Sequence, residues 1–329
     1  MHLVRVAARA KTLSIKFKVK GIVYKSTGSW HAVHDATGNN YECKLKGQYR
    51  IKGLKATNPI AVGDYVQFEL QQGQQIGIIQ KIEERKNYIV RKSINLSKKI
   101  HIIAANIDMA YLVITLALPR TSTGFIDRFL VTAEAYHIPA TLLFNKIDIY
   151  TEKLQKAHAE MKSVYEQVGY SCLEISALRG DNLAQLKNRL AGKINLFSGH
   201  SGVGKSAIIN AIDPSHQRKT GEISESYLKG KHTTTFTEML CLDNAGFIID
   251  TPGIKEFGLI DFKKEDLTHY FPEMFAMLPQ CKFYNCTHTN EPDCAVKTAL
   301  AENRISPSRY RNYVTIFYGE ELDSNQWEY

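Results

Sequence analysis

The stretch Gly199-His200-Ser201-Gly202-Val203-Gly204-Lys205-Ser206 decides the fold of this 329-residue chain. It matches the phosphate-binding loop pattern G-x-x-x-x-G-K-S and lies between an apolar run, Ile194 to Phe197, and a helix-forming stretch, Ala207 to Ile212. In such a loop, backbone N–H groups face the α- and β-phosphates, the lysine reaches the β- and γ-phosphates, and the serine hydroxyl ligates Mg²⁺. The stretch therefore predicts a nucleoside triphosphate site with Lys205 on phosphate and Ser206 on magnesium.

A second motif, Asn145-Lys146-Ile147-Asp148, predicts that the base is guanine. It follows the apolar run Ala140 to Phe144, and it therefore stands at the carboxyl end of an expected strand. Asp148 would accept from guanine N1–H and the 2-amino group, whereas adenine would leave this carboxylate unpaired. We expect Asn145 to brace the loop and the Lys146 stem to cover the base. Further along, Leu173-Glu174-Ile175 leads into Ser176-Ala177, where a backbone N–H would meet guanine O6.

Two further segments predict the magnesium and γ-phosphate contacts. The stretch GFIIDTPG is an expected strand ending in D-x-x-G, in which Asp250 would hold Mg²⁺ through water and the Gly253 N–H would sense the γ-phosphate. Between this stretch and the phosphate loop lies the polar segment 229–235, KGKHTTT. We expect the second of its three threonines, Thr234, to complete the magnesium shell and to act in hydrolysis with Lys205. A threonine run in an ordinary exposed loop is the alternative.

The order of these motifs along the chain is unusual. Most GTPases begin with the phosphate loop, whereas here the base reader comes first, which indicates a circularly permuted α/β domain. A compact domain tolerates permutation because its termini often lie close together. The motifs run in the order 145–148, 176–177, 199–206, 234 and 250–253.

A Cys/His segment follows the D-x-x-G motif. Cys281, Cys286, His288 and Cys294 offer three thiolates and one imidazole, a set that suits a closed, tetrahedral, structural zinc site with one zinc per chain. A disulfide competes poorly, because a nucleotide-using chain without a clear secretory signal belongs in a reducing compartment. Two helices are expected next, over 295–304 and 306–318, the second with Ser306-Pro307 as its start.

The remaining cysteines carry no such pattern. Cys43, Cys172 and Cys241 lie in apolar or alternating stretches, and we expect them to be small buried hydrophobic residues.

The positive charge of the chain is confined to its first part. Residues 1–100 hold 19 Lys and Arg against 6 Asp and Glu, whereas residues 101–329 hold 23 against 27. From Val19 to Val90, short alternating runs are separated by turn residues, which predicts about five strands in a small barrel of the oligonucleotide-binding (OB) type. The expected strands contain residues 21–24, 30–33, 39–43, 62–68 and 76–79.

Basic and aromatic residues alternate in this barrel. Such a surface stacks bases and follows phosphates, and it predicts RNA binding. The alternative is that most of the aromatic residues are barrel core and that the cations form a solvated loop. The aromatic residues are Tyr24, Trp30, Tyr41, Tyr49 and Tyr65, and the expected RNA-binding cations are Lys44, Lys46, Arg50, Lys52 and Lys55.

The first 17 residues contain basic residues and no acidic one. They are too interrupted by Arg5 and Arg9 for a secretory core, and no run of 18 apolar residues occurs in the chain, so we expect no membrane partner. We expect a cytoplasmic monomer. The predicted domains are a basic tail (1–17), an OB-fold RNA-binding barrel (18–95), a circularly permuted GTPase (96–262) and a mostly helical zinc-binding domain (263–329).

Together these motifs resemble the ribosome-small-subunit-dependent GTPase A (RsgA) family over about residues 18–318. The resemblance rests on Asn-Lys-x-Asp placed before the phosphate loop, then Gly-Lys-His-Thr-Thr, Asp-x-Pro-Gly and the Cys/His spacing. It implies a late maturation factor that binds small-subunit rRNA near the decoding centre, hydrolyses GTP to GDP when docked, and then dissociates. This chain departs from the family mainly at His200, where Gln is frequent, and in its longer N-terminal tail.

The residue after D-x-x-G bears on hydrolysis. Many GTPases have Gln there to orient the attacking water, but Ile254 cannot bond a water, so intrinsic hydrolysis is expected to be slow. His232, which resembles the switch histidine of the family, is the candidate substitute; a solvent-facing loop histidine is the alternative. Two other functions stay open, a GTP-switched rRNA-binding module with negligible hydrolysis and a nucleotide-dependent metal chaperone.

Overall fold

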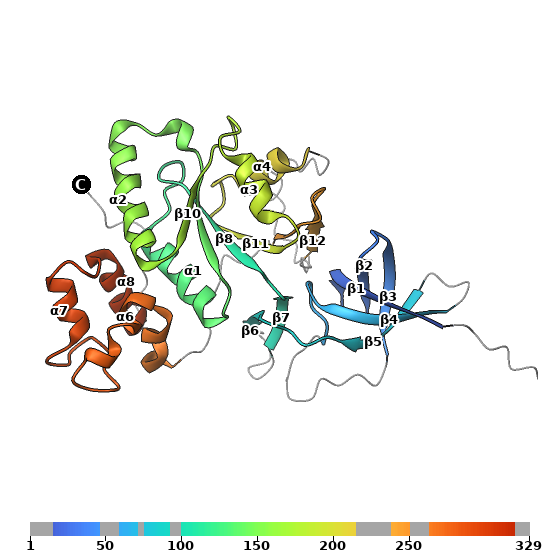
Figure 1. The fold of residues 1–329 in the computed structure, drawn as a ribbon, viewed down its shortest axis with the longest axis horizontal. Helices are drawn as coiled ribbons and strands as arrows, with labels where there is room; N and C mark the ends of the chain where they lie inside the picture. Colours follow the sequence, from blue (N-terminus) through green and yellow to red (C-terminus); the bar gives the residue numbers. More distant parts are fainter. Residues whose placement is uncertain are drawn as a thin grey trace, which may run out of the picture.

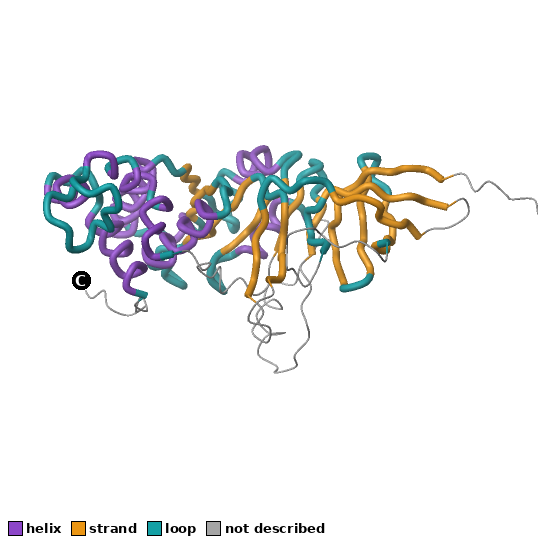
Figure 2. Tube along the Cα trace, turned by 90° about the horizontal axis from the view of Figure 1, so that it is seen from below, coloured by secondary structure: helices purple, strands orange, loops and turns teal. Residues whose placement is uncertain are grey.

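The computed structural model describes residues 16–46, 59–71, 76–92, 100–214, 238–250 and 263–319. Within them, three parts lie in a row: a β-barrel, a central sheet covered by helices, and a small helical domain (Figures 1 and 2). No helix in this part of the chain has the length and hydropathy needed to span a bilayer.

The N-terminal part is a closed five-stranded barrel. Its strands run in the order β1-β2-β3-β5-β4, and β4 pairs back onto β1. β3 and β5 are parallel while the other pairs are antiparallel. The OB-type prediction is confirmed. The strands are β1 (Lys16–Thr27), β2 (Trp30–Asp35), β3 (Asn40–Leu45), β4 (Tyr65–Gln71) and β5 (Ile76–Ile82).

Inward-facing side chains of alternating positions fill the barrel. Val23, Val33, Cys43, Phe68 and Ile79 are all fully buried there, as the period-2 pattern of strands requires. Cys43 is therefore the small buried residue that the sequence predicts. The prediction is wrong for Cys241, which is exposed at the end of a four-residue strand, and Cys172 is only partly buried.

The central domain is a six-stranded sheet in the order β10-β9-β8-β11-β13-β12, parallel except for β12. The apolar runs predicted as strands are strands here. The strands are β8 (Met109–Ile114), β9 (Ala140–Phe144), β10 (Ser171–Glu174), β11 (Ile194–Ser198), β12 (Glu238–Cys241) and β13 (Phe247–Asp250).

Helices cover both faces of this sheet (Figure 1). α1 (Thr123–Ala135) and α2 (Glu152–Val168) bury Ile126, Phe129 and Tyr165 in one core. α3 (Leu183–Leu190) and α4 (Lys205–Ile212) bury Leu186 and Ile208 in the other. A short 3-10 helix, η1 (Ile147–Ile149), follows β9.

The barrel and the sheet share one hydrophobic core. Ile22 and Val62 of the barrel belong to the same buried cluster as Ile249 and Met239 of the sheet. A hairpin between the two, β6 (Tyr88–Lys92) and β7 (Ile100–Ala105), adds Ile89 and Ala104 to it. β12 also pairs with β1, so that the barrel extends the central sheet to eleven strands.

The C-terminal part consists of short helices. The helix predicted from Ser306-Pro307 is confirmed, whereas the helix before it ends at Ala301 instead of Arg304, because Asn303 adopts a left-handed conformation (φ 56°). The elements are η4 (Lys264–Tyr270), α6 (Pro272–Phe275), η5 (Leu278–Gln280), α7 (Ala295–Ala301) and α8 (Pro307–Tyr318).

A buried ion pair clamps the start of the barrel's β4 to the segment leading into the hairpin. The Arg85 Nε and Nη2 atoms each lie 2.6 Å from a carboxylate oxygen of Asp64, which is fully buried. Arg85 also donates to the Pro59 carbonyl, at 2.9 Å, and Asp64 accepts from the Ala61 N–H, at 2.8 Å.

Asp64→Ala should therefore destabilise the barrel strongly, because it leaves the Arg85 guanidinium buried without its carboxylate. Loss of one partner of such a pair costs about 3–5 kcal/mol. The measurement is urea unfolding followed by barrel tryptophan fluorescence. Lys81→Ala, which removes the exposed Lys81–Glu83 pair, is the control and should cost no more than about 1 kcal/mol. Equal losses in the two variants would contradict the clamp.

Candidate nucleotide site and metal cluster

The phosphate loop connects β11 to α4 in a conformation that its glycines permit. Gly199, Gly202 and Gly204 have positive φ values of 140°, 83° and 98°. A Cβ on Gly204 would lie 2.4 Å from Asn145 Nδ2, and one on Gly199 would lie 2.6 Å from the Val113 carbonyl. Both glycines are therefore required by conformation and by close approach.

Lys205 is the first residue of α4 and folds back over this loop. Its Nζ donates to the carbonyl oxygens of Gly199, at 2.6 Å, and His200, at 2.8 Å. Ser206 follows it in the first turn, where a helix presents N–H groups without intrahelical partners. An ammonium and a helix N-terminus thus meet at one loop, which suits a polyphosphate.

The Asn145 side chain bonds two segments that lie 32 and 58 residues further along the chain. Its Nδ2 donates to the Val203 carbonyl at 2.8 Å, and its Oδ1 accepts from the Ala177 N–H at 3.1 Å. The side chain is 1% exposed. Asn145 therefore holds the base reader, the Ser-Ala turn and the phosphate loop together.

The carboxylate of Asp148 is held from one side. Ser176 Oγ donates to Asp148 Oδ1 at 2.5 Å, and Ser176 Oγ itself accepts from the Arg179 N–H at 3.1 Å. Ser176 is fully buried, whereas Asp148 is partly exposed. This leaves Asp148 oriented and accessible to a base.

Lys146, the residue expected to cover the base, lies against the phosphate loop. It has a left-handed backbone (φ 64°), and its Nζ donates to the Gly202 carbonyl at 2.9 Å and to the Leu118 carbonyl. The lysine therefore bridges two loops at the mouth of the site.

The second of those loops was not predicted from the sequence. Residues 115–122 join β8 to α1, and Pro119 lies 3.4 Å from the position of a Cβ on Gly202. Next to it, the Phe125 ring stacks on the His200 imidazole with centroids 3.8 Å apart. Partial burial, and then the Lys205 charge, lower the pKa of His200. Only the place of this loop in the sheet could have indicated its role, because it follows β8, a parallel strand whose carboxyl end lies at the edge where the motifs meet.

Part of the predicted γ-phosphate machinery lies outside the described residues. These positions are His232, Thr234, Gly253 and Ile254. The backbone of Asp250 is described at the end of β13, where it pairs with Phe197 of β11. Asp250 therefore stands beside the strand end that leads into the phosphate loop.

The four residues of the Cys/His segment come together. One ligand atom from each of Cys281, Cys286, His288 and Cys294 lies within 4.8 Å of all the others. Burial raises the pKa of Cys286 to about 12 and lowers the pKa of His288 to about 4. Thiols that resist ionisation in this way need a cation to be held as thiolates, and three sulfurs with one imidazole fit zinc.

On the barrel, the aromatic residues divide into two groups. Trp30 is 37% exposed, and the Nζ of Lys44 lies 4.0 Å from its ring centroid; Lys46, just after the end of β3, is exposed. Tyr41, in contrast, packs against Phe68 in the barrel wall. Tyr65 is exposed and Tyr24 is partly buried, whereas Tyr49, Arg50, Lys52 and Lys55 lie outside the described residues.

Comparison with known proteins agrees with this arrangement. Residues 82–260 match the RsgA GTPase family and residues 20–79 match the RsgA N-terminal domain. The chain belongs to the RsgA GTPase family. It is 52% identical to proteins named small ribosomal subunit biogenesis GTPase RsgA from Flavobacterium psychrophilum and Christiangramia forsetii, over 92% of this chain and 93% and 97% of those proteins.

Two solved structures are similar to this chain over more than nine-tenths of its length. The crystal structure of YjeQ from Thermotoga maritima covers 93% of this chain and all of that one, at a TM-score of 0.77 and 34% identity. YloQ, described as a circularly permuted GTPase, covers 95% of this chain and 98% of that one, at 0.73 and 28%. The permuted order predicted from the motifs is therefore confirmed.

Asp148→Asn should shift base preference, because an amide at this position can donate to the 2-oxo group of xanthine but cannot accept from both guanine donors. GTP affinity should fall by a few kcal/mol, and xanthosine triphosphate should become the better ligand. Competition against a fluorescent GDP measures both. Asp181→Asn, which changes an exposed carboxylate in the neighbouring turn, is the control. Unchanged GTP affinity in Asp148→Asn would contradict the assignment.

Proposed function

We propose that this GTPase acts in biogenesis of the small ribosomal subunit, with GTP bound at the junction made by Asn145. That junction carries the proposal, because one buried amide holds a base-reading carboxylate and a phosphate loop in fixed relation. The names of its relatives support the biological role. The guanine contacts would come from the Asp148 carboxylate, next to the Ser176-Ala177 turn, whose Ala177 N–H already donates to Asn145 Oδ1.

Hydrolysis follows from the residues around the γ-phosphate. Lys205 would stabilise the charge that develops on the β- and γ-phosphates, and Ser206 with Thr234 would ligate Mg²⁺. Asp250 would bind the metal through water and Gly253 would sense the γ-phosphate. His232 would orient the water in place of Ile254. We infer that docking on the subunit completes this arrangement, and that hydrolysis to GDP then releases the protein.

The test of this function is GTP turnover by the full chain with purified small subunits, compared with large subunits and with free RNA. Stimulation by small subunits alone supports the proposal. Equal stimulation by small subunits, large subunits and free RNA would contradict a specific role at the small subunit and indicate a general response to RNA. We also infer that the chain works in the cytoplasm as a monomer, and sedimentation of the free protein tests its oligomeric state.

The barrel is the proposed rRNA-binding surface. Trp30 has a partly exposed ring that could stack on a base, Lys44 lies over this ring, and Lys46 is an exposed cation two residues further along the chain. Proteins that bind single-stranded nucleic acid combine aromatic rings and cations in this way. Arg50, Lys52 and Lys55 follow Lys46 in the sequence and extend the positive charge.

Trp30→Ala with Lys44→Ala and Lys46→Ala should weaken subunit association and reduce the salt slope by about two units, because two phosphate contacts are lost. The intrinsic hydrolysis rate should not change. Binding measured over a salt series checks this. Lys153→Ala with Lys156→Ala on α2 removes the same charge far from the barrel and is the control. A normal salt slope in the barrel variant would place the RNA surface elsewhere.

The Cys/His cluster is proposed to hold one structural zinc. Elemental analysis of the purified chain should give one zinc per chain, which resists mild chelation. Cys286→Ala should release the metal and speed amide exchange over residues 263–319, because the metal supplies folding free energy there. Cys172→Ala, outside the cluster, should retain the zinc. Full zinc retention in Cys286→Ala would contradict the ligand set.

A further inference from the structure

Helix α1 contacts the nucleotide site at one end and the C-terminal helices along its length. At its start, Ser122 Oγ caps the helix by accepting from the Phe125 N–H at 3.3 Å, and the Phe125 ring stacks on His200 in the phosphate loop. The carbonyl of this same His200 accepts from Lys205. The loop that binds phosphate is thus held by Lys205 on its backbone and by Phe125 on its side chain.

Two residues beyond Phe125, α1 is fixed to the C-terminal domain. Asp127 is fully buried and accepts from Arg309 Nη1 at 2.7 Å and Asn312 Nδ2 at 2.6 Å, both on α8. It also accepts from the Tyr165 hydroxyl of α2 at 2.9 Å. Further along α1, Val131 is part of the hydrophobic core of the C-terminal helices.

Arg309 makes this attachment rigid. It bonds Glu273 of α6 through Nε at 2.7 Å and Nη2 at 2.9 Å, and its guanidinium lies 4.6 Å from the Phe271 ring centroid. Burial alone would lower the pKa of Arg309, but Asp127 and Glu273 raise it well above its usual value. Arg309 is therefore always charged, and separation of α8 from α1 would leave the Asp127 carboxylate without its cation.

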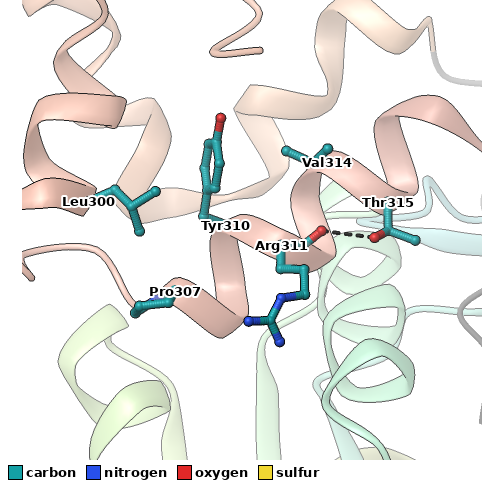
Figure 3. Close-up of a pocket in the computed structure, with 6 residues that line it drawn as sticks. All are labelled: Leu300, Pro307, Tyr310, Arg311, Val314 and Thr315. Atoms are coloured by element: carbon teal, nitrogen blue, oxygen red, sulfur yellow. Dashed lines mark hydrogen bonds between the residues drawn. The ribbon is translucent and has the colours of Figure 1, made fainter. Parts of the chain in front are cut away.

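α8 has two distinct faces. Arg309, Asn312 and Tyr313 are buried on the inner one. The other face, which includes Arg311 and Val314, lines a groove of about 420 Å³ with Leu300 of α7 (Figure 3).

α8 also holds the Cys/His loop. Tyr310 donates to the His288 carbonyl and Tyr313 donates to the Thr287 carbonyl, each at 2.7 Å.

We propose that Phe125 is a positioning residue for the GTP phosphates, and that docking of the C-terminal helices on Asp127 sets its position. The contacts are continuous: the Cys/His loop bonds α8, α8 bonds Asp127, and the same helix carries Phe125 onto the phosphate loop. The coupling is reciprocal, so nucleotide binding stabilises the docked α8. This inference rests on the proposed nucleotide site.

The first test is Phe125→Leu in the full chain, with fluorescent GDP as the probe. Loss of the ring stack should raise the Kd for GDP and the KM for GTP about two- to tenfold. The kcat should stay within about twofold, because Phe125 contacts no reacting atom. Phe125→Tyr keeps the ring and should restore wild-type values. Phe247→Leu removes a ring that contacts His34 of the barrel, outside this path, and should leave the Kd unchanged.

The second test measures the coupling itself by amide exchange in residues 307–318. In the wild type, saturating GDP should slow exchange there, and in Phe125→Leu saturated with GDP this slowing should be lost. Asn312→Ala removes one bond to Asp127 and should raise the Kd for GDP, and the double variant should show less than the product of the two single effects.

Two outcomes would overturn the proposal. One is that GDP does not change amide exchange in residues 307–318 of the wild type. The other is that the fold-change in Kd of the Phe125→Leu, Asn312→Ala double variant equals the product of the two single effects. Lys205→Ala distinguishes failure of the coupling proposal from failure of the proposed nucleotide site. If the wild type binds GDP and Lys205→Ala does not, the site stands whatever α8 does. If Lys205→Ala binds normally, the proposed nucleotide site itself is wrong.

Discussion

One buried carboxylate, Asp127 of α1, links three helices, α1, α2 and α8. A charge with no exposed surface is stable only with full hydrogen bonding, and here its donors come from α2 and α8. Removing one partner of such a pair costs about 3–5 kcal/mol, which is a large part of the stability of a domain. The orientation of the C-terminal helices is therefore set by specific polar bonds as well as by the apolar core around Val131.

The nucleotide edge follows a different constraint. Parallel strands bring their carboxyl ends to one side of a sheet, so the motifs that follow β9, β10 and β11 meet there whatever their order in the chain. Permutation changes the connections and leaves this edge intact. Asn145 shows the consequence, because its two bonds reach segments 32 and 58 residues away.

The features that could be predicted from the sequence are those that a short stretch of residues encodes, namely strands and motifs. The run Ala140–Phe144 is a strand with the predicted bounds, the barrel has its five strands, and the four metal-binding candidates converge. Arg309 and Phe125 could not be predicted, because their partners lie 182 and 75 residues away and neither belongs to a motif. Cys241 was predicted wrongly because an apolar neighbourhood does not reveal where a short strand ends.

The permuted order also has a consequence during synthesis. β8, β9 and β10 are adjacent both in the chain and in the sheet, and α1 and α2 cover them, so these strands can pair and pack early, whereas Asp127 of α1 gains Arg309 and Asn312 only when α8 has been made. β11 arrives later and adds to the open edge of β8. A chain that folds from its N-terminus as it emerges can thus pair β8, β9 and β10 first and then add to them the strand that leads into the phosphate loop.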